Sequence, residues 1–496
     1  MTNLAENLVA AAAARPAHAA LKCGPTTYSY AAFDDAAARV ATLLADNGIE
    51  PGDRIGLMLP NVPEFAILFY GILRAGAVAV PMNPLLKSRE IEFYLSNTSA
   101  KILFAVPTFA EEANAGAQAA GARCIIADDA LVAAIAGSTP QAAPVARDGL
   151  DTAVILHTSG TTGKPKGAEL THVGLGRNAE VSVRTLFSAQ PDDVIMGCLP
   201  LFHVFGLTCG LNSAVYSQST LTLIPRFDPR VVLDTIAADK VTIFEGVPTM
   251  YSALIAARTD TDDTSTLRLC ASGGAALPAQ VITDFEAAFD AAILEGYGLS
   301  ETSPVACFNH PDKERKAGSI GTPIEGVEMR VVTVDGTEAD VDAPGEIQIR
   351  GHNVMKGYWN LPEATAKSID ADGWFSTGDV GTKDADGYYR IVDRTKDMII
   401  RGGFNIYPRE VEEVLYEHPA VAAAAVVGIP HSSLGEEVGA AVQLKPGASV
   451  TEEELRDYTK ERVAAYKYPR QIWFLDALPT GPTGKIQKRD IVIPTN

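Results

Sequence analysis

The loop that decides the fold and the chemistry of this chain reads Thr158-Ser-Gly-Thr-Thr-Gly-Lys-Pro-Lys-Gly167. Its ten residues hold three glycines, four hydroxyl side chains and two lysines. Such a loop offers many N–H and O–H donors backed by positive charge, which is what a polyphosphate requires. The apolar run at residues 153–156 comes shortly before it and is typical of a buried strand. The residues therefore predict a polyphosphate-binding loop.

Two other interpretations of the loop are weaker. A Walker A loop places Ser or Thr directly after its lysine, whereas Pro165 follows Lys164. This spacing excludes a P-loop kinase or NTPase. A flexible turn rich in Gly, Ser and Thr is the plain alternative, but linkers rarely pair such hydroxyls with two lysines.

The composition limits the class of protein and its partners. A chain of 496 residues, 47% of them apolar, is globular and long enough for two or more domains. Its net charge of −20 argues against nucleic acid and anionic membrane surfaces as partners. A small-molecule substrate is expected, and the sequence leaves a homodimer open.

The expected location is the cytoplasm. The six cysteines form no CxxC pair, which favours reduced thiols. No uninterrupted apolar stretch reaches the length of about 18 residues that a transmembrane helix needs. The N-terminus also lacks the basic and apolar regions of a signal peptide.

The hydrophobic pattern of the first half of the chain alternates between helix and strand. This alternation predicts a mostly parallel sheet covered by helices. The segment 110–145 is rich in alanine and poorly patterned, so its elements are weakly predicted. The expected elements are helices at residues 30–46, 61–75, 88–96 and 229–238, and strands at residues 54–59, 77–81, 102–105 and 241–244.

The last third of the chain has a different pattern. From about residue 320, alternating segments separated by Gly, Pro and Asp turns predict antiparallel strands at residues 327–333 and 345–350. After Arg394 we expect a separate small α+β unit. Its expected elements are a helix at 408–418, a strand at 421–429 and a helix from the capping box Thr451-Glu-Glu-Glu454 to about residue 465.

Six further segments carry polar or glycine-rich motifs. They are Leu199-Pro-Leu-Phe-His-Val204, Ser272-Gly-Gly-Ala-Ala-Leu277, Glu295-Gly-Tyr-Gly-Leu-Ser-Glu301, Trp374-Phe-Ser-Thr-Gly-Asp379, Asp393-Arg-Thr-Lys-Asp397 and Pro479-Thr-Gly-Pro-Thr-Gly-Lys485. In this order, and with the loop, they resemble the adenylate-forming superfamily, which includes acyl-CoA synthetases, aryl-CoA ligases, luciferases and nonribosomal adenylation domains. The resemblance covers roughly residues 25–490. The motif from Glu295 to Pro304, together with Ile400-Arg-Gly-Gly403, is most similar to bacterial fatty-acyl-CoA synthetases.

The resemblance implies a two-step reaction that uses ATP, Mg²⁺ and CoA. A carboxylate, expected to be a medium- or long-chain fatty acid, attacks the α-phosphate of ATP to give acyl-AMP and pyrophosphate. The CoA thiolate then displaces AMP.

The resemblance also implies a fold class and a division into domains. The fold is expected to be α/β, with a large N-terminal AMP-binding domain at residues 1–393 built of layered, mostly parallel sheets, helices and a small antiparallel β subdomain. A hinge at residues 394–397 and a small, mobile α+β C-terminal domain at residues 398–496 are expected to follow.

Catalytic roles are expected for three residues. Lys485, on a loop rich in Gly and Pro, can reach both the carboxylate and the phosphate bridge, where a cation lowers their repulsion. The resemblance places Lys396 at the hinge position, where backbone rotation swings the small domain between the two half-reactions. It also makes His203 a gate between the ATP site and the CoA channel. From the residues alone, His203 is a lone core histidine, since no second His or Cys stands at ligand spacing.

The expected nucleotide site combines the loop with the later motifs. Tyr297, between two glycines, would stack on adenine, and Asp379 can accept from both ribose hydroxyls, with Arg394 on the same ribose. Glu301 would hold Mg²⁺, because a hard cation prefers carboxylate oxygen beside phosphates. The full ATP- and AMP-binding set is Thr158, Ser159, Gly160, Thr161, Thr162, Gly163, Lys164, Lys166, Gly274, Glu295, Gly296, Tyr297, Ser300, Asp379 and Arg394.

The acyl and CoA sites follow mainly from the resemblance. The acyl pocket is expected to be lined by five residues, and the small ones among them would leave room for a long tail, although ordinary core packing explains these residues nearly as well. These acyl-binding residues are Phe205, Gly206, Val247, Thr249 and Gly298, with Gly274 beside them. The expected CoA contacts are Gly402, Gly403 and Arg226, for which a hairpin turn and an exposed loop arginine are the plain alternatives.

Two departures from the family pattern bear on function. Ser300 replaces the usual Thr but keeps the hydroxyl, so we expect its phosphate contact to survive. Ile400 and Gly402 stand where many aryl-CoA ligases and luciferases carry Lys, which weakens the assignment to aryl acids. The open alternatives are an aryl-acid (4-coumarate-like) CoA ligase, an acyl-AMP ligase that loads a carrier protein, and a non-catalytic nucleotide-binding protein. Intact Lys485 and Glu301 argue against the last of these.

Overall fold

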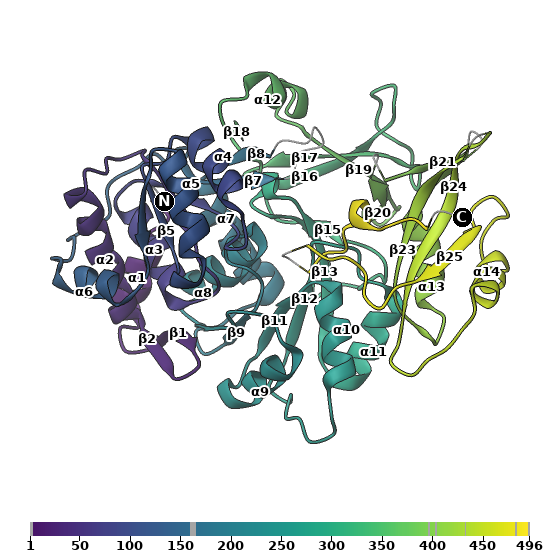
Figure 1. Cartoon of the computed structure of the whole chain (residues 1–496), viewed down its shortest axis with the longest axis horizontal. Coiled ribbons are helices and arrows are strands. Elements are labelled where there is room, and N and C mark those ends of the chain that lie inside the picture. The colour runs from purple at the N-terminus through teal and green to yellow at the C-terminus, as the bar shows by residue number, and fades with distance from the viewer. Residues whose placement is uncertain are drawn as a thin grey trace.

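The computed structural model describes residues 3–158, 165–394, 397–401, 404–431, 433–481 and 484–494, without the side chains of Asp393, Arg394 and Asn405. In this part of the chain the strands form four sheets. Figure 1 shows the N-terminal elements on the left and a small sheet with α13 and α14 on the right.

A seven-stranded sheet carries the two ends of the predicted polyphosphate loop. Its order is β18 (Gly357–Tyr358), β8 (Lys166–Thr171), β7 (Thr152–Thr158), β4 (Val78–Pro81), β3 (Arg54–Met58), β5 (Ile102–Ala105) and β6 (Arg123–Ile126). Strands β7, β4, β3, β5 and β6 pair in parallel, whereas β8 returns antiparallel to β7, with Thr158 opposite Lys166. Both ends of the loop are therefore held by one β-hairpin.

A nine-stranded sheet provides the strand ends that carry the later motifs. Its order is β15 (Thr322–Pro323), β14 (Val305–Phe308), β13 (Ala292–Gly298), β12 (Leu269–Ser272), β11 (Ile243–Gly246), β9 (Val194–Gly197), β10 (Thr220–Leu223), β1 (Ala19–Cys23) and β2 (Thr26–Ser29). Strands β11, β12 and β13 pair in parallel. Their carboxyl ends therefore meet at one edge, which is where ligands bind in open α/β sheets.

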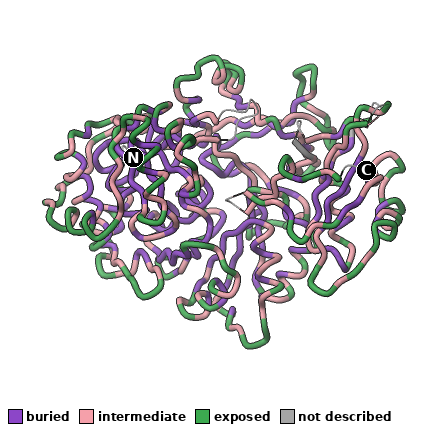
Figure 2. The backbone as a smooth tube through the Cα atoms, viewed as in Figure 1, coloured by how far each residue is buried: buried purple, intermediate pink, exposed green. Residues whose placement is uncertain are grey.

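Helices surround and separate these two sheets (Figure 1). The α-helices are α1 (Glu6–Ala14), α2 (Tyr30–Asp46), α3 (Pro63–Arg74), α4 (Ser88–Thr98), α5 (Ala110–Ala119), α6 (Asp129–Gly137), α7 (His172–Val181), α8 (Ser213–Ser217), α9 (Pro229–Asp239), α10 (Pro248–Ala257), α11 (Ala279–Phe289) and α12 (Pro362–Ser368). Shorter turns are the 3₁₀ segments η1 (Pro107–Phe109), η4 (Ser300–Thr302) and η5 (Lys488–Asp490), and the π-helical segments η2 (Ser182–Phe187) and η3 (Gly206–Asn212). One hydrophobic core runs through both sheets, and Figure 2 shows buried backbone along their centres.

Two antiparallel units complete the fold. A four-stranded sheet contains β16 (Val327–Val332), β17 (Gly345–Gly351), β19 (Phe375–Lys383) and β20 (Tyr389–Arg394). The C-terminal unit contains β22 (Phe404–Ile406), β21 (Ile399–Arg401), β24 (Gly435–Leu444), β23 (Val421–His431), β25 (Gln471–Phe474), α13 (Pro408–Tyr416) and α14 (Glu452–Lys460). This C-terminal unit has a core of its own, in which Val411 and Leu415 of α13 pack on Val426 and Val442.

The predicted α/β fold is confirmed, and most predicted elements fall within a few residues of the observed ones. Helix α2 matches residues 30–46, because Ser29 caps its first turn and Gly48 leaves it with a left-handed φ of 75°. The predicted extent of the last helix is wrong. Helix α14 has the expected Thr451–Glu454 capping box but ends at Lys460, where Arg462 N bonds Thr459 O in a tighter turn.

The alanine-rich segment 110–145, for which the sequence predicted no definite element, forms α5, β6 and α6. Its side chains are mostly half-buried or exposed, so its pattern of apolar residues is weak. Among the described residues, no helix is long and apolar enough to cross a membrane.

Candidate active site

The seven- and nine-stranded sheets meet at the expected metal residue. Glu301, in the η4 turn after β13, is buried, and its Oε1 accepts from the Tyr358 hydroxyl at 2.9 Å and from Thr158 Oγ1 at 3.4 Å. Lys166 Nζ lies 4.8 Å from the centroid of the Tyr358 ring. The carboxylate thus lies at the mouth of the hairpin that holds the polyphosphate loop. Residues 159–164, which carry Ser159, Gly160, Thr161, Thr162, Gly163 and Lys164, lie outside the described residues.

The donor set around Glu301 fits Mg²⁺. This ion keeps several waters and takes one or two carboxylates together with substrate phosphates. Among the described residues there is no group of three or more His, Cys, Asp or Glu that could hold a metal ion, so a cage made only of protein ligands is absent there. Glu301, with the hydroxyls of Thr158 and Tyr358 beside it, would hold the ion, which supplies positive charge to the phosphates when bound.

A second contact brings together the residues expected at adenine and ribose. The Tyr297 hydroxyl, from β13, donates to Asp379 Oδ2 in β19 at 2.5 Å. Asp379 is 4% exposed, and its backbone pairs with that of Arg394 in β20. The side chain of Arg394 is not among those that the structure describes. The ring and the carboxylate therefore stand together, as one nucleoside site needs.

The glycines beside Tyr297 are required by packing of the protein itself. A Cβ on Gly296 would lie 2.0 Å from the ring of Phe308, and one on Gly298 would lie 1.9 Å from the Pro304 carbonyl oxygen. Ser300 begins the η4 turn that carries Glu301. These glycines thus allow β14 to approach β13.

The C-terminal loop that carries Lys485 lies against the carboxyl end of β11. Thr249 Oγ1 donates to the Gly484 carbonyl at 2.9 Å, and a Cβ on Gly484 would lie 3.0 Å from Val247 Cγ2. Loss of hydration, together with the positive charge of Lys485, lowers the pKa of His203 to about 4. The imidazole of His203 is therefore neutral at pH 7.

The residues expected at the acyl group also gather at these strand ends. Val247 is the N-cap residue just before α10, and its Cγ1 would be 3.5 Å from a Cβ on Gly274, which has a φ of 79°. The ring of Phe205 would be 3.1 Å from a Cβ on Gly273. A Cβ on Gly206 would lie 2.5 Å from the Pro200 carbonyl oxygen, so packing of the protein itself also requires a glycine there. Its place in the acyl pocket stays a prediction.

Of the three expected CoA residues, the structure describes Arg226. Arg226 follows β10 and is exposed. Gly402, Gly403 and Lys396, the residue expected at the hinge, lie outside the described residues. Their roles stay predictions.

Sequence reasoning missed three groups. Two of them, Tyr358 and Arg409, come from segments in which no motif was recognised. The Tyr358 hydroxyl donates to Glu301, and Arg409 Nη2 lies 3.8 Å from Glu295 Oε1. Glu295 itself is buried and accepts from Leu277 N at 3.0 Å. The third is Glu245 of β11, which is 1% exposed and whose Oε1 has no hydrogen-bond partner among the described residues. The sequence did offer a sign of this buried carboxyl, because Glu245 is a charged residue inside an otherwise apolar strand.

The buried carboxyl of Glu245 predicts a pH-dependent loss of stability. Burial raises its pKa well above the ordinary 4.5, so the folded protein keeps a proton that the unfolded chain releases above pH 4.5. The free energy of unfolding then falls as pH rises from 4.5 to the pKa of Glu245 in the folded protein, by up to about 1.4 kcal/mol per pH unit. The Glu245→Gln variant removes this dependence. We expect the difference in melting temperature, variant minus wild type, to increase by roughly 1 °C per pH unit as pH rises from 5 toward the folded pKa of Glu245.

The matched control for this prediction is Glu92→Gln, which changes an exposed glutamate in α4. Its difference from the wild type should stay constant with pH. A constant difference for Glu245→Gln as well, followed by differential scanning fluorimetry, would show that Glu245 is ionised in the fold.

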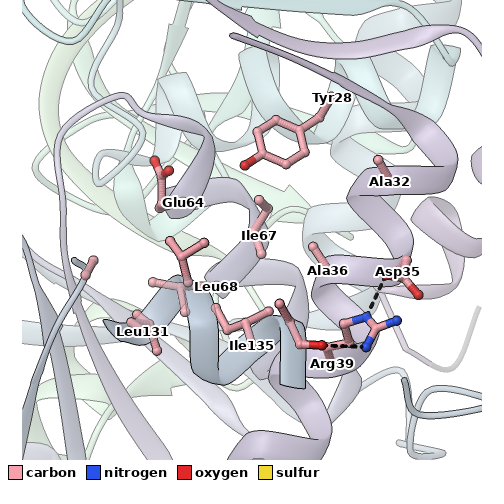
Figure 3. A pocket seen from close by; sticks show the side chains of 13 residues that line it. Tyr28, Ala32, Asp35, Ala36, Arg39, Glu64, Ile67, Leu68, Leu131 and Ile135 are labelled. Carbon is pink, nitrogen blue, oxygen red and sulfur yellow. Dashed lines mark hydrogen bonds and ion pairs between the residues drawn. The ribbon is translucent and has the colours of Figure 1, made fainter. Parts of the chain in front are cut away.

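A separate cavity of about 400 Å³ lies between α2, α3 and α6. Figure 3 shows Ile67, Leu68, Leu131 and Ile135 along it, with Glu64 and Tyr28 toward one end. No predicted site residue lines it, so it is distinct from the site described above.

Comparison with known proteins decides the family. The family model described as AMP-binding enzyme matches residues 8–359. The family model described as AMP-binding enzyme C-terminal domain matches residues 410–485. The chain belongs to the AMP-binding enzyme family. It is an acid–CoA ligase of the adenylate-forming superfamily, whose CoA ligases use ATP and CoA.

The relatives of this ligase act on different acids. The chain is 36% identical to a long-chain-fatty-acid–CoA ligase of Bacillus subtilis, covering 92% of this chain and 88% of that protein. It is 38% identical to a feruloyl-CoA synthase of Amycolatopsis, covering 96% of each. The relatives therefore leave the substrate class unresolved.

The structural comparison bears on the arrangement of the ligase. The crystal structure of ATP-bound MatB from Rhodopseudomonas palustris, 33% identical, superposes with a TM-score of 0.92 over 99% of this chain and 98% of that one. The apo structure of the same protein gives 0.83 at the same coverage. Because the sequence is the same in both comparisons, the difference lies in conformation. This chain is arranged more like the ATP-bound form.

Proposed function

We propose that this ligase activates a medium- or long-chain fatty acid in two steps at one nucleotide site. The acid attacks the α-phosphate of ATP to form acyl-AMP and pyrophosphate, and CoA then displaces AMP. The observation that carries the proposal is the docked C-terminal loop, held to Thr249 at Gly484 with Lys485 acting on His203. A cation delivered there offsets the repulsion between carboxylate and triphosphate.

The other residues divide the remaining tasks. Tyr297 and Asp379 would orient the nucleoside, and Thr158, Lys166 and Glu301 would bind the phosphates and Mg²⁺. Neutral His203 would stand at the junction of the ATP site with the CoA path. The roles of these residues, the domain limits 1–393 and 398–496, the hinge at 394–397, the cytoplasmic location and a homodimer are proposals that rest on the sequence.

An aryl acid is the second candidate substrate. The feruloyl-CoA synthase of Amycolatopsis, at 38% identity, favours it. Ile400 and Gly402, which stand where many aryl-CoA ligases carry lysine, argue for the aliphatic acid.

A panel of acids tests the proposal. Acetate through palmitate, together with cinnamate and benzoate, would be assayed for acid-dependent ATP–pyrophosphate exchange and for AMP release with CoA. We expect the highest kcat/KM with medium or long fatty acids. Preference for cinnamate or benzoate would assign the aryl class. Exchange without thioester formation from CoA would indicate an acyl-AMP ligase that loads a carrier protein.

A further inference from the structure

A cation of the C-terminal unit lies between two carboxylates, where this small unit borders the preceding part of the chain. That preceding part, which holds the other three sheets, is called the large unit below. Arg409 is the second residue of α13, and its side chain is 12% exposed. Its Nη1 donates to the Ile391 carbonyl of β20 at 2.9 Å, and its Nη2 lies 3.8 Å from Glu295 Oε1 of β13. Its Nε lies 3.6 Å from Glu413 Oε1 on its own helix. Arg409 therefore contacts two elements of the large unit at once.

Both carboxylates also contact the segment that begins α11. Glu295 Oε1 accepts from Leu277 N at 3.0 Å, and Glu413 Oε2 accepts from Ala279 N at 3.4 Å. Glu295 is 3% exposed, and its Oε2 has no hydrogen-bond partner among the described residues. An unpaired buried carboxylate is unfavourable, so the charge of Arg409 is what makes an ionised Glu295 tolerable there.

The same helix is tied to the loop that carries Lys485. Lys488 Nζ lies 2.8 Å from Glu412 Oε1, next to Glu413 in α13. Lys488 stands three residues after Lys485. When Arg409 docks α13, the loop is therefore carried along toward Thr249.

We propose that Arg409 is a positioning residue that holds the small unit in the arrangement for acyl-AMP formation, by pairing with Glu295 across the border. The inference rests on the proposed two-step function, in which the small unit must leave this arrangement for CoA transfer. Departure of Arg409 leaves Glu295 buried without its cation. Release of the small unit from the large unit is therefore easier when Glu295 takes up a proton.

The charges around Glu295 fix the direction of the pH effect. The groups that face its carboxyl are Arg409 and Glu413 from α13 and the Leu277 N–H from the segment before α11. Burial raises the pKa of Glu295 to about 7, although Arg409 acts to lower it. Below pH 7 the protonated Glu295 attracts Arg409 less, and docking weakens. Above pH 7 the carboxylate is ionised and docking is strongest.

Separate assays of the two half-reactions test this role. We expect Arg409→Gln to lower acid-dependent ATP–pyrophosphate exchange by about tenfold or more, while CoA transfer from supplied acyl-AMP stays close to that of the wild type. The control is Arg456→Gln, which removes an arginine paired to Glu452 within α14 and should leave both rates unchanged. Equal loss in both half-reactions, or unchanged exchange, would overturn the inference.

A pH series distinguishes positioning from simple structural support. In the wild type, the ratio of exchange to CoA transfer should rise between pH 6 and pH 8, and in Glu295→Gln this rise should disappear. The same rise in both proteins would overturn the role of Glu295. Trypsin provides a readout other than activity, since faster cleavage after Arg394 or Lys396 is expected in Arg409→Gln than in Arg456→Gln. Wild-type protein without exchange for any acid would instead reject the proposed function, and the inference with it.

Discussion

Replacing Lys485 by alanine is expected to lower acyl-AMP formation by at least ~10²-fold, the scale of removing one charge-stabilising donor. In the docked arrangement the loop of Lys485 lies on Thr249, and its charge acts on His203. Alanine removes the cation that offsets the repulsion between the acid and the triphosphate. Thioester formation from supplied acyl-AMP has no such repulsion to overcome, so it should change far less.

ATP–pyrophosphate exchange measures the first step, and release of AMP from synthetic acyl-AMP with CoA measures the second. Lys445→Ala is the control, because Lys445 is an exposed lysine of the same C-terminal unit. It should leave both steps intact. Equal losses in the two steps for Lys485→Ala would reject the role given to this lysine.

Replacing Lys396 by proline is expected to spare acyl-AMP formation and to slow CoA transfer by about tenfold or more, a rise of about 1.4 kcal/mol in the barrier. Proline fixes φ near −65° and restricts the residue before it. If the small unit rotates at residues 394–397, this change hinders the departure of Arg409 and the Lys485 loop from the large unit. The docked arrangement itself, which resembles the ATP-bound relative, needs no such rotation.

Single-turnover kinetics with ATP, acid and CoA separates these phases for Lys396→Pro. The acyl-AMP phase should match that of the wild type, and acyl-AMP should accumulate before the thioester forms. The matched control is Lys396→Ala, which removes the same side chain but leaves φ free. Proline at another lysine, such as Lys383, would not serve as a control, because Lys383 lies within β19. Unchanged CoA transfer in the proline variant would place the pivot elsewhere.

Local patterns predicted the fold because they depend on neighbours in the chain. The helix at residues 30–46 carries its apolar face and its cap in its own sequence, and α2 forms there. The sequence around α5 and α6 could not be interpreted in the same way, because alanine satisfies buried and exposed positions alike. The early end of α14 depends on a turn at Thr459 that no strong helix breaker marks.

The candidate site was predictable where motifs carried the polar groups. Thr158 with Glu301, and Tyr297 with Asp379, were predicted for one nucleotide site, and each pair is in contact. Arg409 could not be found in this way. Its partners come from three different elements, and its position depends on how two units pack.

The glycine positions show a second limit of sequence reasoning. Gly206 and Gly298 were interpreted as room for a ligand, but carbonyl oxygens of Pro200 and Pro304 occupy the space that a Cβ would need. A motif glycine signals a close approach without saying what approaches. Only the packing of neighbouring strands and turns distinguishes the two cases.

The central claim is that one ATP binds with its phosphates at the β7–β8 hairpin and its ribose at Asp379. Calorimetric titration of the full chain with ATP and Mg²⁺ tests it most directly. We predict saturable binding of one nucleotide per chain, weakened in Asp379→Asn and in Glu301→Gln. No saturable binding to the wild-type protein, or equal binding by all three proteins, would contradict the claim.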